Sequence, residues 1–257
     1  MTSPTPTIPL EVDLTNPGQF LACCGLLELA SRINPEAAGW FDGARFCFTV
    51  EESKLLDALL HCTCAPIITA DSGEGDQEPK SPPVNLGSPF DLVLDWWEDD
   101  AATHAGFKTW SGGQTMIGFV EGMRKHIAGH VSDGCGLFAA MPIKPPPKPF
   151  YFDSRSSRLT SLDLGFSADG FTTAFSPAVE LLALIGMQRF RPGTIIERER
   201  YAFATWNTPL PASIAAAVAP GLIPTLIDRR YQFPLVIRTG GKYKAFGPAT
   251  LERSFHD

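Results

Sequence analysis

Lysine and arginine, the side chains that bind phosphate groups, gather in the second half of the chain. Residues 1–140 hold 7 Lys/Arg against 19 Asp/Glu, a net charge of −12, whereas residues 141–257 hold 14 against 9, a net charge of +5. The whole chain, at −7, hides this split. The second half also carries more than half of the aromatic residues. Because cations neutralise phosphates and aromatic rings stack on bases, the pattern indicates a surface that faces nucleic acid.

Several basic residues fall in turns or at the ends of predicted elements, where long side chains can reach a phosphate backbone. Arg189 and Arg191 flank Phe190 directly after a predicted buried helix, which gives them a rigid base. The glycine-containing turn over 109–115 opens another helix and can face an anion. Two alternatives stay open: the arginines are ordinary solvated or ion-paired surface, and the turn is a plain helix entry. The residues that we expect to contact nucleic acid are Trp110, Gln114, Arg155, Arg158, Arg189, Arg191, Lys242 and Lys244.

Residue patterns typical of catalysis, metal binding and nucleotide binding are missing from the sequence. His126 and His130 lie one helical turn apart, but the stretch between them lacks the glutamate of an H-E-x-x-H zinc motif. Cys62 and Cys64 have no second pair at zinc-finger spacing. Walker, G-x-G-x-x-G and G-x-S-x-G motifs are absent as well. The sequence therefore predicts no metal, no cofactor and no catalytic residue.

The elements that must position these side chains alternate between strands and helices. The helix that begins at Gly18 is apolar on almost every side, so we expect it to be buried. The mixture predicts an α+β fold with mixed or antiparallel sheets and packed helices, in one or two subdomains. We expect strands over 8–13, 44–50, 90–97, 150–153, 160–166, 200–206 and 231–237, and helices over 18–33, 51–60, 115–128 and 177–188.

The switch in charge suggests two parts, an acidic α+β part over 1–140 and a basic α+β part over 141–257. Residues 65–88 are rich in acids, prolines and glycines, which predicts a mobile loop. Pro234 inside a predicted strand favours the edge of a sheet.

No apolar stretch approaches the roughly 20 residues of a membrane span, and the N-terminus lacks the pattern of a secretory signal. We therefore expect a cytoplasmic protein without membrane contact.

Four stretches of this sequence together resemble one known family. They are VDLTNPGQFLACCGLLELA over 12–30, KTWSGGQ over 108–114, PFYFDSR over 149–155 and PAVELLALIGMQRFRP over 177–192. These stretches are similar to the Cascade subunits of type I-G (formerly I-U) CRISPR systems. They are more specific than any short catalytic motif, and they are spread over most of the chain.

The resemblance implies a non-catalytic subunit of an RNA-guided surveillance complex, in a position like that of the large subunit. Such a subunit contacts guide RNA and target DNA, helps to recognise the motif that flanks the target, and recruits a helicase-nuclease. The implied partners are the guide RNA, the target DNA, the other Cascade subunits and the helicase-nuclease effector. At 257 residues the chain is short for a large subunit, so an accessory subunit stays open.

Two other functions also stay open. The chain could be a ribonuclease that processes the guide precursor, with His126 or His130 as general base. It could instead be a scaffold subunit whose arginines bind acidic partner proteins.

Overall fold

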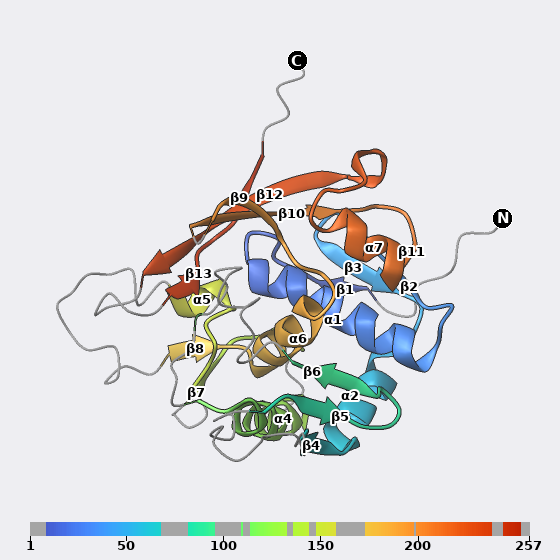
Figure 1. The fold of residues 1–257 in the computed structure, drawn as a ribbon, viewed down its shortest axis with the longest axis vertical. Coiled ribbons are helices and arrows are strands. Elements are labelled where there is room, and N and C mark those ends of the chain that lie inside the picture. Colours follow the sequence, from blue (N-terminus) through green and yellow to red (C-terminus); the bar gives the residue numbers. More distant parts are fainter. Residues whose placement is uncertain are drawn as a thin grey trace, which may run out of the picture.

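The computed structural model describes residues 9–67, 82–95, 109, 114–132, 136–143, 148–157, 173–197, 199–237 and 244–252, which form an α+β fold (Figure 1). This confirms the predicted fold class. The helices are α1 (Pro17–Ile33), α2 (Glu52–His61), α4 (Met116–Ser132), α5 (Ser154–Ser157), α6 (Pro177–Met187) and α7 (Ala212–Val218), with a 3-10 turn at Pro224–Leu226. The strands are β1 (Leu10–Glu11), β2 (Ala38–Asp42), β3 (Arg45–Phe48), β4 (Cys64–Pro66), β5 (Val84–Leu86), β6 (Leu92–Leu94), β7 (Met141–Ile143), β8 (Thr173–Phe175), β9 (Gly193–Ile196), β10 (Arg200–Thr205), β11 (Leu210–Pro211), β12 (Arg229–Ile237), β13 (Lys244–Phe246) and β14 (Thr250–Leu251).

The described strands pair antiparallel in several small sheets. One sheet has the order β1-β3-β2-β11, and a second has the order β13-β12-β10-β9, with β14 also paired to β12. The remaining strands form the sheets β4-β5-β6 and β7-β8. Leu210 of β11 pairs with Gly39 of β2, so the first sheet contains strands from both sides of the charge switch. One hydrophobic core likewise runs from Val12 to Ala249, and the acidic and basic parts therefore share a sheet and a core.

Helices α1 and α6 lie buried at the centre of this core and touch through glycine. Residues 17–30 of α1 and every residue of α6 are buried. A Cβ atom at Gly25 would overlap the carbonyl oxygen of Leu182, and one at Gly186 would overlap that of Leu21. Only glycine at these two positions lets the backbones approach so closely. Within the described residues, neither this pair nor another helix has the length and apolarity to cross a membrane.

The two helices run parallel, with their N-termini together and their C-termini together. At one end, the Asp153 carboxylate accepts hydrogen bonds from the Asn16 side chain, which caps α1, and from the backbone of Ser176, which caps α6. At the other end, Arg189, just after α6, forms an ion pair with Glu28 in the last turns of α1. Parallel helices place like ends of their dipoles side by side. A negative charge at the two N-termini and positive charges at the two C-termini therefore stabilise the pairing.

The glycine contact predicts a clear mutational result. Gly186→Ala should lower the free energy of unfolding by roughly 1–3 kcal/mol or more, because the new methyl group forces the helices apart. Gly129 in α4 is the matched control, since a Cβ there meets nothing within 4 Å. Gly129→Ala should raise stability by about 0.5–1 kcal/mol through helix propensity. Urea unfolding of both variants checks this, and a Gly186→Ala protein as stable as the parent would contradict the close contact.

Some predicted elements differ from the structure. Parts of the predicted loop over 65–88 belong to strands, β4 at its start and β5 near its end. In β5, Val84 and Leu86 are buried with Asn85 between them, which is the alternation of a strand. Residues 68–81 lie outside the described part of the chain, as do Trp96 and Trp97 and the predicted strand over 160–166. Residues 150–153 form no strand, since their backbone bonds to a side chain of α6 instead.

Pro234 does not lie at a sheet edge, because β12 has β10 on one side and β13 and β14 on the other. The N–H of Leu235 donates to Glu199 on the β10 side, and the carbonyl of Pro234 accepts from Gly247 on the other side. The missing N–H of Pro234 therefore faces the interval between β14, which pairs with residues 231–232, and β13, which pairs with residues 235–237. An interior strand tolerates proline here because no ladder bond is lost.

Candidate nucleic-acid interface

Residues 148–157 cross the N-termini of α1 and α6 and bind both. Asp153 is fully buried, and its Oδ1 and Oδ2 lie 2.8 Å from the Asn16 Nδ2 and 2.9 Å from the Ser176 backbone nitrogen. The Oδ1 of Asn16 accepts from the N–H groups of Gly18 and Ser154, both at 3.1 Å. Asp153 and Asn16 therefore satisfy donors at three chain segments that are far apart in sequence.

Glu180, fully buried in the first turns of α6, holds the same segment through its backbone. Its Oε2 accepts from the N–H of Phe150 at 2.8 Å and its Oε1 from that of Asp153 at 2.9 Å. Burial raises the pKa of Glu180 to about 8, the backbone donors act against this rise, and the Asp153 carboxylate adds to it. Glu180 is therefore mostly a neutral carboxyl group at pH 7, and it is a hydrogen-bond anchor for the segment.

Arg155, one of the predicted phosphate contacts, binds a carboxylate of its own chain. Its Nη2 lies 2.6 Å from Oδ2 of Asp153 and its Nε 2.9 Å from Oδ1, a bidentate ion pair. The Arg155 side chain is 26% exposed, whereas that of Asp153 is wholly buried. Its charge therefore serves first to balance a buried anion, in keeping with the ion-paired alternative left open by the sequence.

Arg189 is in the same situation at the opposite end of the helix pair. Its Nε lies 2.5 Å from Oε2 of the buried Glu28 in an ion pair without hydrogen-bond geometry, and its Nη2 donates to Oε1 at 3.1 Å. Arg32 binds the same carboxylate from α1 at 2.8 Å. Arg189 and the neighbouring Arg191 are thus separated from Arg155 by the length of α6, so these three predicted cations do not form one patch.

The other predicted contacts divide between the 148–157 segment and a neighbouring groove. Gln114 donates from Nε2 to the carbonyl of Lys148 at 3.0 Å, so it lies beside this segment. Lys244 begins β13, whose Phe246 donates to the Tyr151 carbonyl, but its side chain lines a groove with Glu197, Glu199 and Arg200. Trp110, Arg158 and Lys242 lie outside the described residues.

Most aromatic rings of the second half are unavailable for stacking on bases. Of the described aromatic residues in 141–257, all but Tyr151 are buried in the core. Tyr151 is half-buried and has a φ of 67°, a left-handed conformation that is costly for a bulky residue. Tyr151 was not among the predicted contacts, since nothing in the pattern FYF distinguishes it from the two buried phenylalanines beside it. The buried roles of Glu28, Asp153 and Glu180 were not predicted either.

The described residues contain no group of three His, Cys, Asp or Glu side chains placed to bind a metal ion. His126 is half-buried on α4, and the side chain of His130 lies outside the described part. Comparison of the chain with protein-family models, with curated proteins and with solved structures finds no match.

The raised pKa of Glu180 predicts a particular pH dependence of stability. The carboxyl stays protonated when folded up to about pH 8 but ionises in the unfolded chain above its ordinary pKa of 4.5. The stability that Glu180 contributes is therefore complete below pH 4.5 and falls as the pH rises to about 8. Glu180→Gln removes this dependence and leaves one backbone N–H without an acceptor. The stability difference between parent and variant, measured by urea unfolding, should shrink from pH 5 to pH 8.5, and a constant difference would exclude a neutral Glu180.

The ion pair of Arg189 predicts an effect on stability without nucleic acid. Arg189→Ala should cost about 1–3 kcal/mol, because buried Glu28 keeps only Arg32 as a partner. In the Glu28→Gln background the same change should cost much less, which a double-mutant cycle measures. Arg45→Ala is the control, since its 3.8 Å pair with Asp42 is exposed on both sides and should contribute under about 0.5 kcal/mol. Equal costs in both backgrounds would contradict the pairing.

Proposed function

We propose that this chain is a non-catalytic subunit of an RNA-guided type I CRISPR surveillance complex, of the type I-G Cascade class. In this role it contacts the guide RNA or target DNA, helps to recognise the flanking motif and recruits the helicase-nuclease. The guide supplies sequence specificity by base pairing, and the protein contributes backbone contacts and shape.

The observation that carries the proposal is that all four family-like stretches meet in one bonded unit. Stretches 12–30 and 177–192 form the parallel helix pair, and stretch 149–155 bonds to the N-termini of both helices. The fourth stretch joins at its two described residues, since the Thr109 hydroxyl donates to the Phe150 carbonyl and Gln114 to that of Lys148. The four stretches that carry the resemblance therefore belong to a single structural unit.

The 148–157 segment is the part of this unit that suits contact with a nucleic acid. It presents an exposed lysine, Lys148, and the half-buried ring of Tyr151, while Asp153 and Glu180 fix its backbone from below. A cation and a ring on a rigid backbone can bind one phosphate and stack on one base. Arg155 takes part as the partner of Asp153, and Trp110, Arg158, Arg189, Arg191, Lys242 and Lys244 stay predictions of this function.

The decisive experiment co-expresses the full chain with its operon neighbours and asks whether it elutes with a guide-RNA-bearing assembly. In that assembly Lys148→Ala should weaken target binding at every sequence and lower the slope of log K against log salt by about 1. Tyr151→Asn should weaken binding about tenfold through lost stacking while keeping its fold, because asparagine tolerates a left-handed backbone. Lys54→Ala, on an exposed turn of α2, is the control and should change neither quantity.

Other results would replace the proposal. Elution of the chain with partner proteins but without RNA would select the scaffold function, in which the arginines bind acidic proteins. Cleavage of a guide precursor by the purified chain, abolished by His126→Ala, would select the processing ribonuclease.

A further inference from the structure

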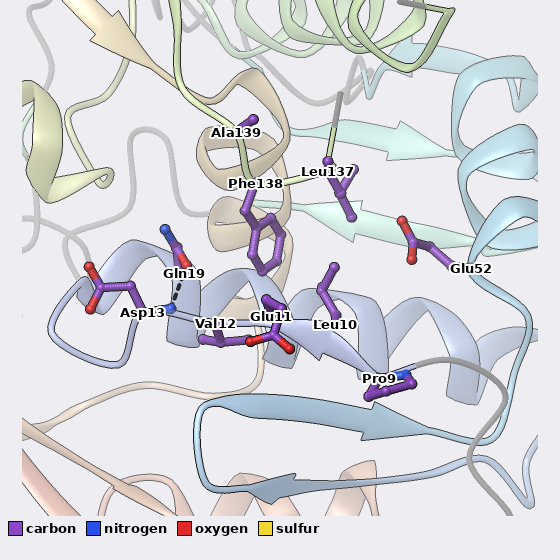
Figure 2. A pocket seen from close by; sticks show the side chains of 11 residues that line it. Pro9, Leu10, Glu11, Val12, Asp13, Gln19, Glu52, Leu137, Phe138 and Ala139 are labelled. Carbon is purple, nitrogen blue, oxygen red and sulfur yellow. Dashed lines mark hydrogen bonds between the residues drawn. The ribbon is translucent and has the colours of Figure 1, made fainter. Parts of the chain in front are cut away.

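A groove of about 640 Å³ runs beside β1 on the acidic side of the sequence. Figure 2 shows β1 and the start of α1 on one side, the chain over 137–139 on the other, and Glu52 of α2 at one end. Leu137 and Phe138 point from the upper side toward β1, and both are buried, so this side of the groove is apolar. The groove shares no lining residue with the 148–157 segment.

The backbone of β1 offers this groove an open sheet edge. Among the described strands β1 pairs with β3 alone, and the N–H of Val12 donates to Ala44 next to that pairing. Because backbone groups alternate along a strand, the N–H and C=O of Glu11 point away from β3. An exposed strand edge of this kind is a template for another extended chain.

The charged side chains among the described residues that line the groove are all acidic. These residues include Glu11, Asp13 and Glu52 and no lysine or arginine. Glu52 is partly buried, and this burial raises the pKa of its carboxyl group. A positive group placed here from outside would therefore be attracted by all three side chains.

We propose that this groove is a docking site for an extended segment of a partner protein in which basic residues alternate with apolar ones. The segment adds a strand to β1 through the N–H and C=O of Glu11. Its apolar side chains lie against Leu137 and Phe138, and its cations lie near Glu52 and Asp13. A second copy of this chain is a poor occupant, since pairing β1 with another β1 would bring two sets of acidic side chains together. The site does not rest on the nucleic-acid function proposed above.

The test uses the full chain and a synthetic probe, the capped peptide Lys-Val-Arg-Val-Lys-Val. Binding of the peptide is measured by calorimetry and by amide NMR. The peptide should bind in the micromolar to millimolar range, more weakly as salt rises, and the Glu11 N–H should become protected from exchange. Glu11→Pro removes the outward N–H together with the Glu11 carboxylate but no bond to β3, so it should leave the fold intact and weaken binding at least tenfold, and more than Glu11→Gln, which removes the charge alone. Glu52→Lys should weaken it as well, while Glu36→Lys, on an exposed turn, should reduce it much less.

Two matched peptides separate the parts of the interaction. Replacing Lys and Arg by Glu should abolish binding, and N-methylation of the central residues should do the same by blocking backbone pairing. The proposal is wrong if the basic peptide fails to bind, if Glu11→Pro binds it as the parent does, or if the acidic peptide binds equally. It is also wrong if the chain dimerises through β1, shown by a dimer that Glu11→Pro dissociates.

Discussion

Two parallel helices in contact at Gly25 and Gly186 place like ends of their dipoles next to each other, an arrangement that opposes their pairing. The structure offsets this at both ends. Asp153 lies where the two positive N-termini meet, and Arg32 and Arg189 lie where the two negative C-termini meet. The 148–157 segment, the sheet contacts of both halves and the candidate interface are all built around this pair.

The buried carboxylates explain why Arg155 and Arg189 of the basic second half bind within the chain, at opposite ends of the helix pair. Asp153 binds Arg155, and Glu28 binds Arg32 and Arg189, so part of the positive charge counted in the sequence balances internal anions. Glu180 differs because it has backbone donors but no cation, and burial therefore favours its neutral form. Charge counted along the sequence thus overstates the charge available to a phosphate backbone.

The sequence predicted elements whose signal is local. The helix start at Asn16-Pro17 and the one at Ser176-Pro177 follow from capping chemistry, and both are confirmed by side-chain hydrogen bonds to the first turns. The site was less predictable, because it depends on which distant residues meet. A single glutamate in each of two mostly apolar helices, Glu28 and Glu180, was the available signal for buried ionisable groups. Its interpretation needed the positions of Arg189 and of residues 150–153, which no local pattern specifies.

The pairing of α1 with α6 has a consequence for the synthesis of the chain. Helix α1 leaves the ribosome about 150 residues before the helix that covers it is complete, an interval of roughly 10–30 s at ordinary translation rates. During this time the apolar face of α1 that packs on α6 lacks its partner, although β2 can already cover another part of the helix. Such a delay favours association with chaperones or with partners translated nearby, and it makes truncated products prone to aggregation.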